Sequence, residues 1–209
     1  MVTFVGAGSG APDLITVRGA KLLSQADVII YAGSLVNPAL LDYKKEGCAV
    51  YNSAEMTLEE VFAVMKGAED EGKMTVRLHT GDPCLYGAIK EQMELLDEAG
   101  ISYEVVPGVS RFCGAAAAVK AEYTLPQVSQ TVIITRMEGR TPVPEREKIR
   151  SLAAHQSTMV IFLSTGLLEG LSRELIAGGY APDTPAAIVY KATWPEEKVF
   201  RCTVETLAQ

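Results

Sequence analysis

Hydrophobic and polar positions alternate with two different periods along the first half of the chain. Runs rich in β-branched residues predict strands at residues 2–8, 27–33, 74–82 and 102–108, with a short one at 49–51. Between them, apolar residues recur every three or four positions, which predicts helices over 13–26, 57–72, 88–100 and 112–121. This alternation indicates a parallel α/β sheet with its ligand at the carboxyl ends of the strands.

The second half shows the same alternation after a polar, proline-containing connector, "EYTLPQ". Strands are predicted at 129–136, 157–164 and 186–192, and helices at 146–155 and 166–178. We therefore expect two α/β domains, residues 1–120 and 121–209. One helix start is specified in detail, because Thr57 and Glu60 have the spacing of a capping box.

The first predicted strand leads into a glycine-rich turn, "FVGAGSGAPDLIT" (4–16). Gly6, Gly8 and Ala11 fit the spacing of a dinucleotide-binding turn, so an NAD(P)-dependent oxidoreductase is one hypothesis. Two features argue against it. The second strand ends in "YAGS" without the acidic residue that holds a ribose, and Pro12 stands where free helix N–H groups are needed.

Two other strand ends carry glycines, in "RLHTGDPCLYGAIKEQ" (77–92) and "VVPGVSRF" (105–112). Asp82 at a strand end could bind hydroxyl groups or a cation, or could form an ordinary Asx turn. His79 could serve the same site or pack inside the sheet. In "ITRMEGRTPVPE" (134–145), Arg136 and Arg140 could clamp carboxylates, or could belong to a solvated loop.

Composition narrows the classes of protein. The 209 residues are 48% hydrophobic and 22% charged, as in a globular protein with a sizeable core. The net charge of −7 argues against a general nucleic-acid or membrane-surface binder, and no apolar run is long enough to span a bilayer. The four scattered cysteines and two histidines predict no metal site and a cytoplasmic protein with free thiols.

Taken together, the motifs resemble those of the tetrapyrrole methylases, a family of enzymes that use S-adenosyl-L-methionine (SAM). The family patterns G-x-G-P-G-x-x-x-L-[IL]-T, G-D-P with [LIV]-[FY]-G, and P-G-[IV]-[ST]-[SA] correspond to "GAGSGAPDLIT", "GDPCLYG" and "PGVSR". The stretches "EGRTPVPE" and "KATWPEEK" are similar to the branch that methylates C11 of precorrin-4 or cobalt-precorrin-4 in cobalamin biosynthesis.

The resemblance implies a fold, a set of ligands and their residues. The fold is a parallel-sheet N-terminal domain and a mixed-sheet C-terminal domain, with the active site in the cleft between them, in a cytoplasmic homodimer. The ligands are SAM, with S-adenosylhomocysteine as product, and a polycarboxylated tetrapyrrole. The expected SAM-binding residues are Thr80, Gly81, Asp82, Leu85, Tyr86, Ser110, Arg111, Leu163 and Ala187.

The expected tetrapyrrole-binding residues are Gly8, Ser9, His79, Arg136 and Arg140; Arg18, Arg77 and Lys191 are further basic candidates. No catalytic acid or base is assigned, because the sulfonium leaving group needs no proton. Ser9 and Arg111 depart from the family pattern, where proline and a small residue are usual. The family continues past "TLAQ", so we also expect an incomplete second domain; a non-catalytic tetrapyrrole- or SAM-binding module is therefore a third hypothesis.

Overall fold

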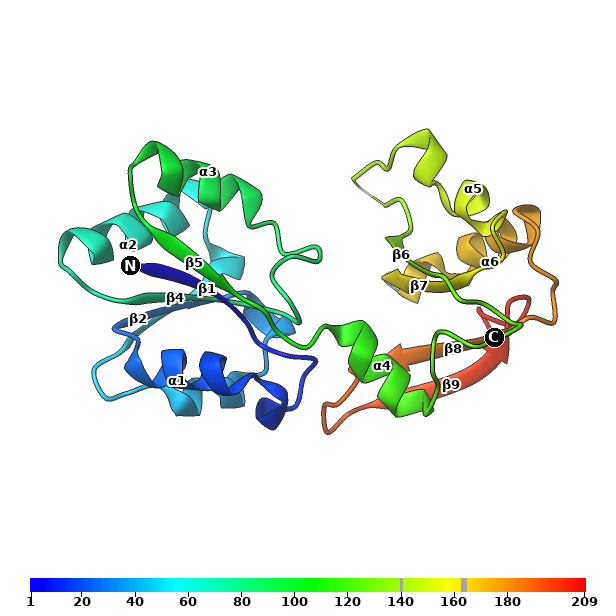
Figure 1. Cartoon of the computed structure of the whole chain (residues 1–209), viewed down its shortest axis with the longest axis horizontal. Coiled ribbons are helices and arrows are strands. Elements are labelled where there is room, and N and C mark those ends of the chain that lie inside the picture. Colours follow the sequence, from blue (N-terminus) through cyan, green and yellow to red (C-terminus); the bar gives the residue numbers. More distant parts are fainter. Residues whose placement is uncertain (140, 163–164) are drawn as a thin grey trace. The chain divides into compact units, whose positions relative to one another are not determined.

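The computed structural model of the chain describes residues 1–139, 141–162 and 165–209. The chain divides into two compact units (Figure 1). Residues 1–115 form the first unit together with 191–195, and residues 116–190 form the second together with 196–209. The sequence places the division at residue 120. The structure places it at 115/116, and it assigns the short segment 191–195 to the first unit because that segment packs there.

The first unit is a five-stranded parallel sheet with the strand order β3-β2-β4-β1-β5. Its strands are β1 (Val2–Gly6), β2 (Val28–Tyr31), β3 (Ala49–Asn52), β4 (Thr75–His79) and β5 (Tyr103–Val106). The helices are α1 (Val17–Gln25), α2 (Leu58–Asp70) and α3 (Lys90–Glu98), and α4 (Arg111–Val119) continues into the second unit. The predicted parallel α/β sheet is confirmed.

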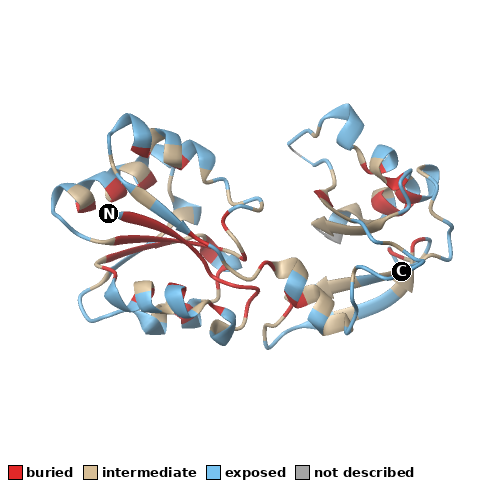
Figure 2. Cartoon of the chain, viewed as in Figure 1, coloured by how far each residue is buried: buried red, intermediate tan, exposed pale blue. Residues whose placement is uncertain are grey.

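Alternating residues of the strands build a core on each face of this sheet. Val5 of β1 packs with Leu23 of α1 on one face, whereas Phe4 packs with Met65 of α2 on the other. Figure 1 shows α1 on one side of the sheet and α2 and α3 on the other. The central strands are buried along their length (Figure 2), as expected for a parallel sheet covered on both faces.

Side-chain caps fix where the helices begin. The Thr57–Glu60 capping box is confirmed, since the Thr57 hydroxyl accepts from the Glu60 N–H and the Glu60 carboxylate accepts from the Thr57 N–H. The helix predicted over 13–26 begins only at Val17, where Thr16 caps it. Pro12 opens a separate 3₁₀ turn, because proline has no N–H to contribute to a helix interior.

The second unit contains two separate two-stranded sheets. β6 (Val132–Arg136) and β7 (Thr158–Phe162) are parallel, and β8 (Pro185–Tyr190) and β9 (Lys198–Thr203) are antiparallel. The helices α5 (Ile149–Ala153) and α6 (Leu168–Ala177) bury Ile149 and Leu171 in a core with Val204 and Leu207. The predicted helix over 146–155 is shorter than expected, because a 3₁₀ turn occupies residues 145–147.

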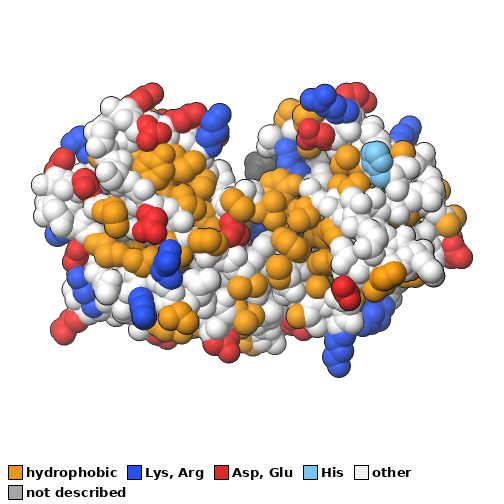
Figure 3. Space-filling model, viewed as in Figure 1, with side chains coloured by type: hydrophobic (Ala, Val, Ile, Leu, Met, Phe, Trp, Pro, Cys, Tyr) orange, Lys and Arg blue, Asp and Glu red, His pale blue; other side chains and the backbone are white. Residues whose placement is uncertain are grey.

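The surface carries charges of both signs, and on the face drawn in Figure 3 acidic and basic side chains lie among hydrophobic ones. Within the described part of the chain, no helix has the length and hydropathy needed to cross a membrane.

Candidate functional site

The carboxyl ends of β1, β4 and β5 meet in a backbone cluster that only glycine fits. A Cβ atom at position 108 would lie 2.2 Å from the Gly81 carbonyl oxygen and 2.7 Å from the Gly6 Cα. These distances are below any normal Cβ contact. The three glycine turns that the sequence singles out therefore come together at one edge of the sheet, the edge where parallel α/β folds bind ligands.

Hydrogen bonds join two of these turns into one surface. The Gly8 N–H donates to the Gly81 carbonyl at 3.2 Å, and the Gly81 N–H donates to the Gly8 carbonyl at 2.9 Å. The Ala7 N–H donates to the His79 carbonyl at 2.7 Å. The opening turn is thus held against the "GDPCLYG" turn by backbone hydrogen bonds to residues at and just after the end of β4.

Asp82 connects the β4 turn to the β5 turn. One of its carboxylate oxygens accepts from the Cys84 N–H at 2.8 Å, and the other accepts from the Gly108 N–H at 2.9 Å. Burial raises the pKa of this carboxyl, but hydrogen bonds from the Cys84 side chain and from both N–H groups lower it by more. The pKa of Asp82 is therefore below its usual value, and the side chain is a carboxylate at neutral pH. Asp82 thus forms the predicted Asx turn, but this turn does not cap the helix expected from residue 88, which begins at Lys90 without a side-chain cap. A role in binding remains compatible with the turn, since a carboxylate has further lone pairs.

Other expected SAM-binding residues lie beside this edge. Gly81 has φ +62°, and a Cβ there would lie 3.4 Å from the Ser110 Cα and from the Arg111 N. Arg111 is half-buried, and burial lowers the pKa of its guanidinium. Tyr86 is exposed, with φ 58°, in the turn that follows Asp82. The structure therefore brings Thr80, Gly81, Asp82 and the Ser110–Arg111 pair to one place, with Leu85 and Tyr86 on the same turn.

His79 and Arg77 lie inside the sheet layer that faces α2 and α3. Arg77 donates to the Gln92 side chain at 3.0 Å, the Ile30 carbonyl at 3.2 Å and the Ser53 hydroxyl at 3.0 Å. Burial lowers the pKa of Arg77 to about 10. His79 is 3% exposed, and burial together with the Arg77 charge lowers its pKa to about 3. Its imidazole is therefore neutral at pH 7 and brings no charge to a substrate carboxylate.

Ser9, which stands where the family pattern has proline, is 3% exposed. Its hydroxyl lies 3.1 Å from the Thr193 hydroxyl. Asn37 holds the same turn from another side, since its side-chain N–H donates to the Gly10 carbonyl at 3.0 Å. The sequence analysis assigns no role to Thr193 or Asn37. Thr193 lies within the stretch "KATWPEEK", beside the lone Trp194, but the sequence does not show that this stretch packs against the opening turn.

The second unit carries the remaining expected residues. Arg136, at the end of β6, donates to the carbonyls of Thr141 and Pro142 at 3.0 and 2.9 Å, so it shapes its own loop. Ala187 is exposed on β8. Arg140 and Leu163 lie outside the described residues. Binding of a ligand by these four residues stays a prediction.

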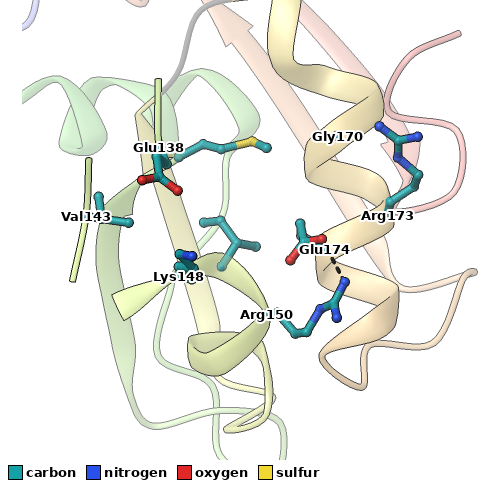
Figure 4. Close-up of a pocket in the computed structure, with 9 residues that line it drawn as sticks. Glu138, Val143, Lys148, Arg150, Gly170, Arg173 and Glu174 are labelled. Atoms are coloured by element: carbon teal, nitrogen blue, oxygen red, sulfur yellow. Dashed lines mark hydrogen bonds and ion pairs between the residues drawn. The ribbon is translucent and has the colours of Figure 1, made fainter. Parts of the chain in front are cut away.

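A pocket of about 490 Å³ lies in the second unit, beside α5 and α6 (Figure 4). Two of its lining residues, Arg150 and Glu174, point toward each other, with 2.9 Å between Nη2 and Oε1. Lys148, which also lines it, lies 2.6 Å from a Glu145 oxygen. Arg150 and Lys148 already have carboxylate partners, and Arg173 is the third cation of the lining. With two of these three cations paired, the pocket is a weaker candidate for an anionic ligand than the glycine edge of the first unit.

Comparison with known proteins matches residues 1–208 to a family model described as tetrapyrrole (corrin/porphyrin) methylases. The cobalt-precorrin-4 C(11)-methyltransferase of Methanocaldococcus jannaschii is 57% identical over 208 residues, which cover 100% of this chain and 80% of that protein.

Solved structures agree with the sequence matches. The X-ray structure of a cobalamin biosynthetic enzyme, cobalt precorrin-4 methyltransferase, superimposes with a TM-score of 0.96 at 53% identity, covering 99% of this chain and 86% of that one. Uroporphyrin-III C-methyltransferase of Thermus thermophilus, solved with S-adenosylhomocysteine, gives a TM-score of 0.81 at 26% identity over 99% of this chain and 85% of that one.

Proposed function

The chain belongs to the tetrapyrrole (corrin/porphyrin) methylase family, and from this premise we propose that it transfers a methyl group from SAM to C11 of cobalt-precorrin-4 in cobalamin biosynthesis. The observation that carries this conclusion is the likeness along the whole chain to the cobalt-precorrin-4 C(11)-methyltransferase of M. jannaschii. The aligned region covers the whole chain and so spans the stretches "EGRTPVPE" and "KATWPEEK".

The glycine edge fits SAM by the chemistry of its groups. SAM carries a positive sulfonium, an ammonium group and ribose hydroxyls. A carboxylate held ionised by backbone N–H groups, as Asp82 is, suits both positive charge and hydroxyl donors. Thr80, Gly81 and Ser110 add hydroxyl and backbone groups beside it. We assign SAM binding to these residues together with Leu85, Tyr86 and Arg111.

When bound, SAM supplies an electrophilic methyl group on a sulfonium that leaves without needing a proton. The contribution of the protein is therefore to bind and orient. Correct alignment of two reacting groups can supply several kcal/mol of a reaction barrier. The tightly packed glycines suit this task, because a rigid backbone surface holds a ligand with little conformational freedom.

The tetrapyrrole carries several carboxylates, and the chain as a whole is acidic, with a net charge of −7. Local cations must therefore bind the substrate, and we assign this role to Arg136 and Arg140. Gly8 and Ser9 contribute through the shape of the opening turn. His79 is neutral, so any contact that it makes with the substrate is a hydrogen bond rather than an ion pair.

We also propose that the protein acts in the cytoplasm as a homodimer. Scattered free cysteines suit a reducing compartment, and an assembly of identical subunits is what the family resemblance implies. Sedimentation of the purified chain would report a mass twice that of the monomer; a monomer at micromolar concentration would contradict the proposal.

The oxidoreductase hypothesis loses its remaining support in the structure. The helix after the glycine turn begins at Val17, beyond the separate 3₁₀ turn at Pro12, so its N–H groups do not follow the turn directly. Asp27 lies at the start of β2, away from its carboxyl end, and accepts from Lys45 and the Met74 N–H. Neither the pyrophosphate contact nor the ribose contact of a dinucleotide site is available there.

The deciding experiment incubates the chain with cobalt-precorrin-4 and SAM labelled with ¹³C in the methyl group. Mass spectrometry should show one methyl group added in place of a hydrogen, and ¹³C NMR should place the label on C11. Label on another ring carbon would contradict the assigned position. Bound SAM without any methylated product would favour the non-catalytic binding module.

A further inference from the structure

A five-residue loop, residues 191–195, packs against the glycine-rich opening turn. The loop lies between β8 and β9 in the sequence, yet it belongs to the first unit. The Thr193 hydroxyl accepts from the Ala11 N–H at 2.9 Å and lies 3.1 Å from the Ser9 hydroxyl. One side chain of the loop thus bonds to both ends of the Ser9–Ala11 segment.

The packing around these bonds leaves no free space. A Cβ atom at position 10 would lie 2.2 Å from Cδ1 of Trp194 and 2.7 Å from the Ala192 carbonyl oxygen. A Cβ at position 114, in α4, would lie 2.8 Å from the Ser9 Cβ and 3.2 Å from Cγ2 of Thr193. Gly10 and Gly114 therefore allow the loop and the turn to approach closely, and a shift of either would displace the other.

The loop holds an unfavourable backbone conformation at the point of contact. Thr193 has φ 68°, in the left-handed region that β-branched residues rarely adopt. Such a conformation is energetically unfavourable and persists only where the surroundings enforce it. Its hydroxyl contacts with Ser9 and Ala11 are among the interactions that hold it in this conformation.

We propose that Ser9 and Thr193 are positioning residues, which fix the turn at residues 8–11 in the shape that binds the tetrapyrrole. This role rests on the proposed function, because that function makes the turn part of the substrate site. Gly8 transmits the constraint through its two hydrogen bonds with Gly81 at the glycine edge. Residues 9 and 10 lie beyond the hydrogen bonds between Gly8 and Gly81. Removing the contacts of the Thr193 hydroxyl with Ser9 and Ala11, which we call the clamp, therefore loosens the substrate turn more than it loosens the SAM-binding residues.

The test compares Ser9→Ala and Thr193→Val with two controls. Thr193→Val keeps the shape and removes the hydroxyl, whereas Thr193→Ser keeps the hydroxyl. Thr206→Val removes a similar contact far along the chain, the 3.0 Å hydroxyl pair of Thr203 and Thr206. We expect Ser9→Ala and Thr193→Val to raise the KM for cobalt-precorrin-4 roughly tenfold, with less than about a threefold change in the KM for SAM. Thr193→Ser and Thr206→Val should match the wild type.

A second readout does not depend on catalysis. Trp194 is the only tryptophan of the chain and lies in the loop itself, with the Lys191 ammonium 5.0 Å from its ring centre. Its emission therefore reports on the loop, and bound cobalt-precorrin-4 should quench it. The quenching midpoint should rise roughly tenfold in Thr193→Val and return to the wild-type value in Thr193→Ser.

Three results would overturn the proposal: unchanged KM and quenching midpoint in both hydroxyl-free variants, equal rises for tetrapyrrole and SAM, or no rescue by Thr193→Ser. If cobalt-precorrin-4 quenches the Trp194 emission of the wild type but no methyl group is transferred, the proposed function is refuted and the role of the clamp is not. The quenching midpoints of the Thr193 variants then still test that role. A wild-type chain that does not bind cobalt-precorrin-4 refutes both.

Discussion

Replacing Asp82 with asparagine removes one negative charge while keeping almost the same shape. The carboxylate accepts two backbone N–H groups, from Cys84 and from Gly108, at 2.8 and 2.9 Å. An amide offers only one oxygen, so its NH₂ group must face the second N–H donor. A charge-assisted hydrogen bond contributes about 1.5–3 kcal/mol, and the Cys84 bond is exposed, so we place the cost of Asp82→Asn at about 2 kcal/mol and of Asp82→Ala at about 3 kcal/mol.

Urea denaturation at pH 7 measures these costs as changes in the free energy of unfolding, and calorimetry with SAM measures the effect on the site. We expect Asp82→Ala to weaken SAM binding more than tenfold, because the carboxylate both binds and holds the β4 and β5 turns together. Asp70→Asn is the matched control. Its carboxylate pairs with Lys66 on an exposed helix surface, so its loss should change stability by less than about 0.5 kcal/mol.

The pH dependence supplies a sign test. The pKa of Asp82 is lowered in the folded state, so its stabilisation is fully present above the unfolded value of about 3.9 and is lost as the pH falls through the folded value. The difference in stability between the wild type and Asp82→Asn should therefore be constant from pH 7 to about pH 4 and shrink below it. A stability of Asp82→Asn within about 0.5 kcal/mol of the wild type at pH 7 would refute the reasoning.

Two further predictions follow from burial and close packing. The pKa of His79 is about 3 in the folded chain and about 6.5 in the unfolded chain, so below about pH 6.5 only the unfolded chain binds a proton at this residue. This difference should lower the free energy of unfolding by about 2 kcal/mol between pH 7 and pH 5. His79→Gln should lose this component of the pH slope and His155→Gln, at an exposed position, should keep it; identical slopes in urea titrations of all three proteins would contradict the assignment. Gly108→Ala should cost about 3 kcal/mol and abolish SAM binding in calorimetry, because its Cβ would meet the Gly81 carbonyl at 2.2 Å, whereas Gly67→Ala, on the open surface of α2, should raise stability by about 0.5 kcal/mol. Equal effects of the two alanines would show that backbone clearance does not shape the edge.

The sequence alone determined the local structure of the first unit and the class of protein. Four of the five strands of this unit contain two or more β-branched residues, whereas the short β3 contains only Val50. The capping box at Thr57 and Glu60 depends only on residues three apart. The glycines after β1, β4 and β5 could be placed at one edge, because the carboxyl ends of parallel strands point the same way. The motifs at these turns were also sufficient to indicate the family.

Only the tertiary structure decided which polar residues are buried and which of them contact each other. His79 and Arg77 alternate with apolar neighbours along β4, and the pattern does not say that α2 and α3 cover their face. Ser9 and Thr193 are 184 residues apart, and no period in the sequence relates them. Periodic patterns record only how a residue lies relative to its near neighbours, whereas burial, pKa and long-range hydrogen bonds depend on what the rest of the folded chain packs against it.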